Sequence, residues 1–104
     1  MSITVANVTT TTANVYVSGG NTAITFLSLC NYGASNVTAN VYVVPAGNSA
    51  GNTNIVLASL PITTLDTYQF YAGMEKLLLS NGDTVQVDCS ANNAITVTTS
   101  YTAL

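Results

Sequence analysis

The chain has 104 residues, 48% of them hydrophobic, with a formal net charge of −3. The sequence contains no His, Arg or Trp, and its only charged residues are Asp66, Glu75, Lys76, Asp83 and Asp88. One lysine cannot form the basic patch that binds nucleic acid. The lack of histidine removes the usual general base and a common zinc ligand. We therefore expect neither a nucleic-acid-binding protein nor an enzyme.

The polar fraction consists mainly of uncharged side chains: 17 Thr, 12 Asn and 9 Ser. Thr favours strands, whereas Asn and Ser favour turns, so this composition predicts an ordered all-β protein with a neutral surface. The length predicts a single domain over residues 1–104. We expect no membrane segment and no export signal, because no apolar run approaches the length of a spanning helix and the N-terminus lacks a basic start.

Apolar and polar residues alternate along short segments of the first half, which predicts strands over 3–9, 13–18, 22–31 and 37–44. The third segment is apolar on both faces of its middle, so we expect a central strand, with Ile24, Phe26 and Cys30 on one side and Leu27 and Leu29 on the other. The Gly- and Asn-containing turn at 31–36 predicts that this strand and the next form a hairpin.

Small polar residues at 45–54 predict an exposed loop that cannot pack on itself. Further strands are expected over 55–60, ended by Pro61, and over 67–72, 84–90 and 95–102. The run at 73–79 is too short for a stable helix and is interpreted as a bend into an apolar strand, ended by the turn at 80–83. About eight short strands predict a single antiparallel β-sandwich, jelly-roll-like or Ig-like.

The two cysteines, Cys30 and Cys89, are both predicted to face inward. They could form a disulfide between sheets or remain free as small buried hydrophobes, and the lack of a signal peptide favours free thiols. The spacing of the four carboxylates matches no calcium-binding loop. We therefore expect no metal and no cofactor.

Tyrosine is the main aromatic residue, with six copies against two of phenylalanine. Tyr16 and Tyr42 are predicted to point away from the valine-rich faces of their strands. For Tyr16, that face is formed by Val15 and Val17. Exposed tyrosines can anchor a protein interface or stack on a sugar ring. Ordinary placement at the edges of a sandwich is the third interpretation.

Several segments together carry a resemblance to a known group of proteins. They are the apolar strand with its Asn-Tyr-Gly-Ala-Ser-Asn turn, then VTANVYVVPAGN, then LLLSNGDTVQVDCS, and a closing ITVT strand. Over about residues 20–104 this order resembles the small β-sandwich structural proteins of tailed-bacteriophage virions. The resemblance implies a capsid decoration (cement) protein or a tail component, commonly trimeric, and it supplies no catalytic residue.

The resulting hypothesis is a non-enzymatic virion structural protein, made in the host cytoplasm. We expect a homotrimer on the capsid exterior that binds and stabilises the lattice of the major capsid protein. One alternative keeps the fold but places the protein in the tail, neck, baseplate or fibre. A second alternative is a carbohydrate-binding module that uses exposed tyrosines.

Two segments are expected to make the contacts, the N-terminal residues 2–12 and the loop at 45–54, because neither is expected to satisfy itself within a compact sandwich. Residues 1–12 are accordingly a candidate for an extended arm. Surplus apolar residues on the strands need cover from a neighbouring subunit. The candidate interface residues are Ile3, Val5, Tyr42, Val44, Pro45, Asn48, Tyr71 and Leu78.

Overall fold

The computed structural model of the chain describes residues 2–70 and 77–104, without the side chain of Phe70. No helix occurs within these residues, and hence none that could span a membrane. The strands are β1 (Ser2–Val8), β2 (Ala13–Val17), β3 (Thr22–Asn31), β4 (Val37–Val44), β5 (Ile55–Ile62), β6 (Thr67–Phe70), β7 (Leu77–Leu79), β8 (Thr84–Cys89) and β9 (Ile95–Ala103).

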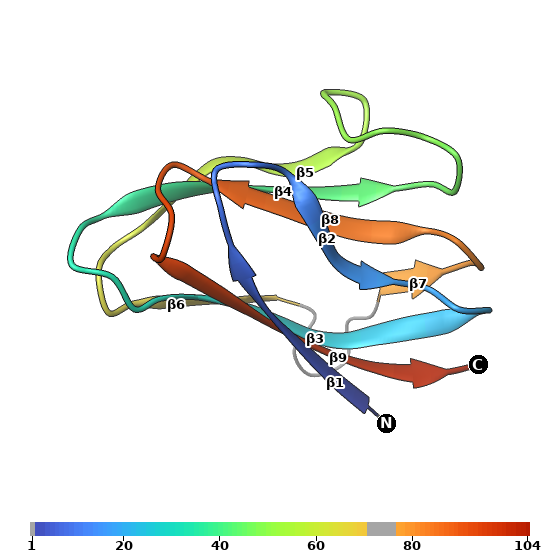
Figure 1. Cartoon of the computed structure of the whole chain (residues 1–104). Coiled ribbons are helices and arrows are strands. Elements are labelled where there is room, and N and C mark those ends of the chain that lie inside the picture. The colour runs from blue at the N-terminus through green and yellow to red at the C-terminus, as the bar shows by residue number, and fades with distance from the viewer. Residues whose placement is uncertain (1, 71–76) are drawn as a thin grey trace.

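The strands form two antiparallel sheets that lie face to face (Figure 1). One sheet has the order β1-β9-β3-β6, and β7 also pairs with β3; the other has the order β2-β8-β4-β5. The predicted all-β sandwich is therefore confirmed, with nine strands in place of about eight. The side chains between the sheets form one apolar core, whose fully buried members include Ile24, Leu27, Leu29, Val41 and Ile95.

A bulge near the start of β3 changes which residues face this core. Ile24 pairs with Tyr101 and Phe26 pairs with Ser100, so the register shifts at the residue between them, Thr25. The prediction that Ile24 shares a face with Phe26 is wrong, because the extra residue of a bulge reverses the alternation. Ile24 instead lies on the core side with Leu27.

The predicted hairpin between β3 and β4 is also wrong, because these two strands belong to opposite sheets. The segment between them crosses from one sheet to the other, and the fully buried Asn31 side chain holds the crossing. Its Nδ2 donates to the carbonyls of Ser35 (2.9 Å) and Ile62 (3.0 Å), and its Oδ1 accepts from the Gly33 N–H (2.9 Å). The crossing is thus held by a buried side-chain amide whose oxygen and nitrogen are both hydrogen-bonded, and not by the backbone hydrogen bonds of a hairpin.

The N-terminal segment lies against its own sheet. β1 pairs with β9 over seven residues, from Ser2 opposite Tyr101 to Val8 opposite Ile95. The segment that was a candidate for an extended arm is thus an edge strand, and the chain satisfies one side of its backbone itself.

The loop at 45–54 also forms its own hydrogen bonds, contrary to expectation. Asn54 organises it: its Oδ1 accepts from the Gly51 N–H (3.0 Å) and its Nδ2 donates to the Ser49 carbonyl (2.9 Å). Asp83 ties the start of the loop to the next turn, because its carboxylate accepts from the backbone N–H of Ala46 (2.9 Å) and of Ser80 (2.8 Å). In Figure 1 this loop curls on the outer side of the four-stranded sheet.

Candidate binding surface

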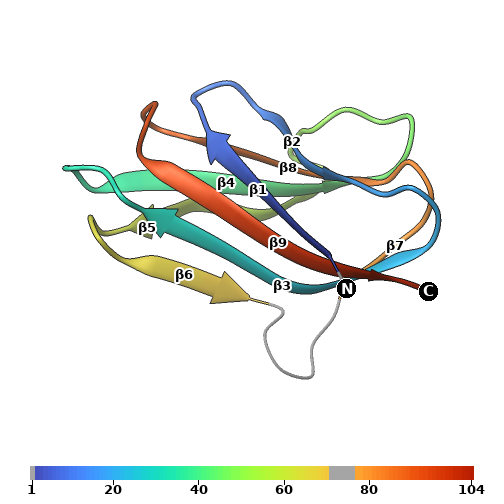
Figure 2. The same ribbon diagram turned by 60° about the horizontal axis from the view of Figure 1, so that its bottom comes forward.

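The outer side of the five-stranded sheet carries no charged side chain among the described residues. Figure 2 looks at this side, with β1, β9, β3 and β6 in order. We call it the uncharged face and define it by the strand residues that point away from the core. They are Ile3, Val5 and Asn7 of β1, Thr96, Thr98, Ser100 and Thr102 of β9, Phe26 and Cys30 of β3, Thr67 and Gln69 of β6, and Leu78 of β7. Ala23 and Ser28 of β3 point to the same side of the sheet but are buried, with 1% and 8% exposure.

Strand register arranges these residues in rows across the sheet. One row runs Val5, Thr98, Ser28 and Gln69; Thr98 at its centre is half-buried, and Ser28 beside it is buried. β9 supplies a hydroxyl to every row because it alternates strictly: its Ile95 and Val97 enter the core while the residues between face outward. The alternation of Thr and Ser on β9 was visible in the sequence, but its position at the centre of a face follows only from the pairing.

Large apolar side chains stand among these hydroxyls. Ile3 is 68% exposed, Val5 70% and Leu78 67%. Within the described part of the chain, the single hydrogen bond from a side chain of this face is the one that Asn7 Oδ1 accepts from the Tyr32 hydroxyl (3.0 Å). The hydroxyl groups of this face thus form no hydrogen bond with any other residue that the structure describes.

The outer side of the four-stranded sheet is organised differently, around the carboxylate of Asp88. Oδ2 of Asp88 accepts from the Thr12 hydroxyl (2.5 Å) and Oδ1 accepts from Asn40 Nδ2 (2.7 Å). Asn40 Oδ1 in turn accepts from the N–H of Ser59 (2.8 Å), a residue of β5 with a positive φ of 50°. This network joins β4, β5 and β8 to the β1–β2 loop.

Tyr42 lies beside this carboxylate on the same side of the sheet. Its partial burial raises the pKa of its hydroxyl above 10.0, and the negative charge of Asp88 and a hydrogen bond to it raise that pKa further. Tyr42 therefore belongs to the network around Asp88 and not to the uncharged face.

The structure separates the predicted interface residues into three groups. Ile3, Val5 and Leu78 lie on the uncharged face, whereas Tyr42 lies on the opposite side of the molecule. Pro45 and Asn48 are exposed on the 45–54 loop, where the Asn48 N–H donates to the Pro45 carbonyl (3.1 Å). Tyr71 lies outside the described residues.

Val44 is not part of any exposed surface, so the prediction that it needs cover from a neighbour is wrong. Its register opposite Thr84 places it on the outer side of the four-stranded sheet, as expected, but it is only 1% exposed. The 45–54 loop begins at the next residue and curls on this side (Figure 1). Residues of the same chain therefore cover Val44.

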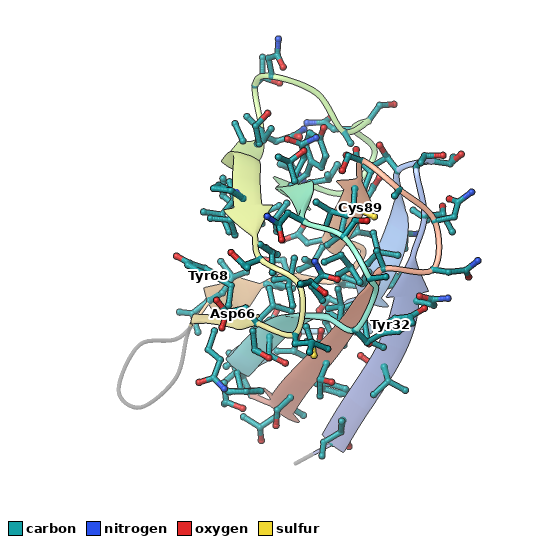
Figure 3. The ribbon with its side chains drawn as sticks, turned by 90° about the vertical axis from the view of Figure 1, so that its left-hand side faces the viewer. Tyr32, Asp66, Tyr68 and Cys89 are labelled. Atoms are coloured by element: carbon teal, nitrogen blue, oxygen red, sulfur yellow. The ribbon has the colours of Figure 1, made fainter. Side chains whose placement is uncertain are left out.

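The described tyrosines do not gather on one surface. The prediction that Tyr16 points away from the core is wrong: a register shift in β2 turns it inward, where it packs against Tyr101 with ring centroids 4.6 Å apart, and Val17 is 54% exposed instead. Figure 3 shows Tyr32 at one end of the sandwich, on the side of β1, away from Asp66 and Tyr68. Tyr42 is on the Asp88 side.

Both cysteines are free, in agreement with the favoured interpretation, but they do not face each other. Cys30 pairs with Thr67 and Thr96 on the uncharged face, so its predicted inward position is wrong. Cys89 does face inward, and its burial raises the pKa of its thiol. Its Sγ donates to the Ala91 carbonyl (2.8 Å), which is the behaviour of a structural thiol and not of a nucleophile.

Within residues 2–70 and 77–104 no pocket is enclosed, and no group of three His, Cys, Asp or Glu side chains could hold a metal ion. The fold and surface define an all-β sandwich in which the outer side of one sheet carries no charged side chain among the described residues. No protein-family model, curated protein or solved structure matches the chain.

Proposed function

We propose that this protein is a non-enzymatic structural component of a virion, a homotrimeric decoration protein that binds the capsid exterior and stabilises the lattice of the major capsid protein. The observation that carries the proposal is the uncharged face, on which exposed Ile3, Val5 and Leu78 stand among hydroxyl groups. Such a surface resembles the core of a protein interface, from which charged residues are depleted. The resemblance of residues 20–104 to virion β-sandwich proteins supports the same role.

The stabilising mechanism is mass action. A protein that binds only the assembled lattice lowers the free energy of that state, by about 2.7 kcal/mol per site at a free concentration of 100 times its Kd. Many copies on one particle multiply this effect. Because the described part of the uncharged face carries no ionised side chain, the affinity of the proposed contact should change little with salt concentration.

The test uses virions of the source virus with and without this protein. Particles that lack it should release their nucleic acid at a lower temperature, and adding the purified protein back should restore the release temperature. Light scattering of the purified protein should give about three times 10.7 kDa. An unchanged release temperature contradicts the stabilising role, and binding at the tail alone in electron micrographs contradicts the capsid position.

A further inference from the structure

β1 differs from the other edge strands of the sandwich in having no device that blocks pairing. β5 carries Pro61, the positive-φ residue Ser59 and two register shifts against β4. β2 is five residues long and has a register shift, and β6 and β7 are short strands of four and three residues. Short strands, bulges, prolines and charges are the usual ways in which proteins block edge pairing. β1 has seven regular pairs and contains no proline or charge.

The open part of this edge runs from Ser2 to Ala6. Beyond it the chain closes onto the other sheet, since the Cys89 N–H donates to the Thr9 carbonyl (3.0 Å) and Cys89 Sγ contacts the Val8 carbonyl (3.8 Å). Val8 itself is 2% exposed. A strand that docks on β1 is therefore limited to about five residues of ladder.

The side chains of this open stretch specify what can dock there. Ile3 and Val5 project outward and are largely exposed, while Thr4 and Ala6 are half-buried and turn toward the sandwich. A matching strand needs β-branched apolar residues on its outer side, small residues on its inner side, and no charge. β1 of another copy meets all of these requirements.

We propose that β1 pairs in antiparallel orientation with β1 of a second copy of this chain, about a two-fold axis at Thr4. This register places Ile3 opposite Val5 of the second copy, twice, and uses Ser2 to Ala6, which is the open stretch. An axis at Val5 would instead place Ser2 opposite Val8 of the second copy. Val8 lies outside the open stretch, where the chain turns onto the other sheet. The two five-stranded sheets then continue into one another, and their uncharged faces become one surface.

The contact is weak by construction. It adds about four to six backbone hydrogen bonds and four apolar side chains, with less than the roughly 1,200 Å² that a stable interface buries. The two copies should therefore associate only at high protein concentration, or where many copies are held together on one particle. The inference does not rest on the capsid role, and a two-fold contact can join two monomers or two trimers.

Sedimentation velocity of the full chain, from about 10 μM to about 1 mM, tests the inference. The mass should rise to twice its low-concentration value. Val5→Lys should weaken this association about tenfold or more, because it places a cation in the apolar cluster of an edge pair. The matched control is Val56→Lys, which changes an exposed valine on the blocked edge β5 and should leave the association unchanged. Both positions are exposed, so both variants should fold, and thermal unfolding checks this.

The double variant Ile3→Glu with Val5→Lys tests the register. Each introduced glutamate then lies opposite the introduced lysine of the second copy, so association should return and should weaken as salt is added. If the axis were at Val5, the two introduced lysines would face each other and association would not return. Hydrogen exchange of the amides at residues 2–6 should slow as the concentration of the unmodified chain rises.

Four results would overturn the inference: no concentration-dependent doubling, association that survives Val5→Lys, equal loss in Val56→Lys, or no recovery in the double variant. None of them bears on the release temperature of virions. Conversely, doubling of a monomer to a dimer would support the β1 contact while contradicting the trimer of the proposed function.

Discussion

The two outer sides of this sandwich use similar residues for different purposes. On the four-stranded sheet, Asp88 collects hydrogen bonds from Thr12 and Asn40, and so joins strands and a loop that are distant in sequence. On the five-stranded sheet, the hydroxyls of residues such as Thr98 have no comparable acceptor within residues 2–70 and 77–104. A single carboxylate therefore ties the polar side chains of one surface into the fold, whereas the described side chains of the other surface are not tied together in this way.

The largest expected effect comes from placing a charge on the uncharged face. Thr98→Glu, at the centre of its row, should weaken the binding of this protein to virions that lack it about a hundredfold. The new carboxylate would be buried in the proposed contact without a partner. The free energy of unfolding should hardly change, since Thr98 is only half-buried and its hydroxyl forms no hydrogen bond with another described residue. Pelleting with the particles measures binding.

Asn14→Glu is the matched control for that variant. Asn14 is exposed on β2 and pairs with Gln86, on the Asp88 side. It should bind virions as the unmodified chain does. Equal loss of binding in both variants would show that the two sides do not differ in this respect.

The next effect concerns stability on the Asp88 side. Asp88→Ala should lower the free energy of unfolding by about 2 kcal/mol, because it removes the hydrogen bonds that Thr12 and Asn40 donate to a charged acceptor and leaves Asn40 Nδ2 without its acceptor. Urea unfolding measures the change. Asp66→Ala removes an exposed carboxylate elsewhere and should stay within about 0.5 kcal/mol of the unmodified chain; a similar loss in both would contradict the role of the network.

Alternation was sufficient to predict much of the sandwich. The bounds of β3 and β4 agree with the predicted segments, because long runs of alternating apolar residues are determined locally. The bulges at Thr25 and Val15 were not predictable, since a bulge exists only relative to a paired strand. They account for the wrong faces given to Ile24 and Tyr16.

The site was less accessible to prediction than the fold. Ile3, Val5 and Leu78 were predicted as interface residues, which stays a prediction, and all three are exposed. That they share one face depends on β1 and β7 joining the same sheet. The turn residues at 31–36 suit a hairpin and a crossing equally well. Which of the two forms depends on the hydrogen-bond acceptors near the Asn31 side chain, and one of these is the carbonyl of Ile62, 31 positions away in the sequence.

A smaller effect separates the two sides of a single strand. Thr99 is fully buried, and its hydroxyl has no partner among the described residues. Thr99→Val should therefore raise the free energy of unfolding by about 1 kcal/mol, because it removes an unsatisfied buried polar group at nearly constant volume. Thr98→Val, one residue earlier and facing outward, should leave stability nearly unchanged. A loss of stability in Thr99→Val would indicate a hydrogen bond to that hydroxyl.

The smallest effect is expected at high pH and again concerns only the Asp88 side. Partial burial, followed by the charge of Asp88, raises the folded-state pKa of Tyr42 above 10.0, so the folded protein prefers the neutral phenol. The stability that this preference contributes is complete below the unfolded pKa, about 10, and is lost as the pH rises through the higher folded value. The difference in ultraviolet absorbance between the unmodified chain and Tyr42→Phe reports this ionisation. Asp88→Asn should move the Tyr42 pKa down without returning it to 10.0, because burial is the larger cause. If Asp88→Asn leaves the titration unchanged, the carboxylate does not act on Tyr42, and the network is limited to the bonds from Thr12 and Asn40.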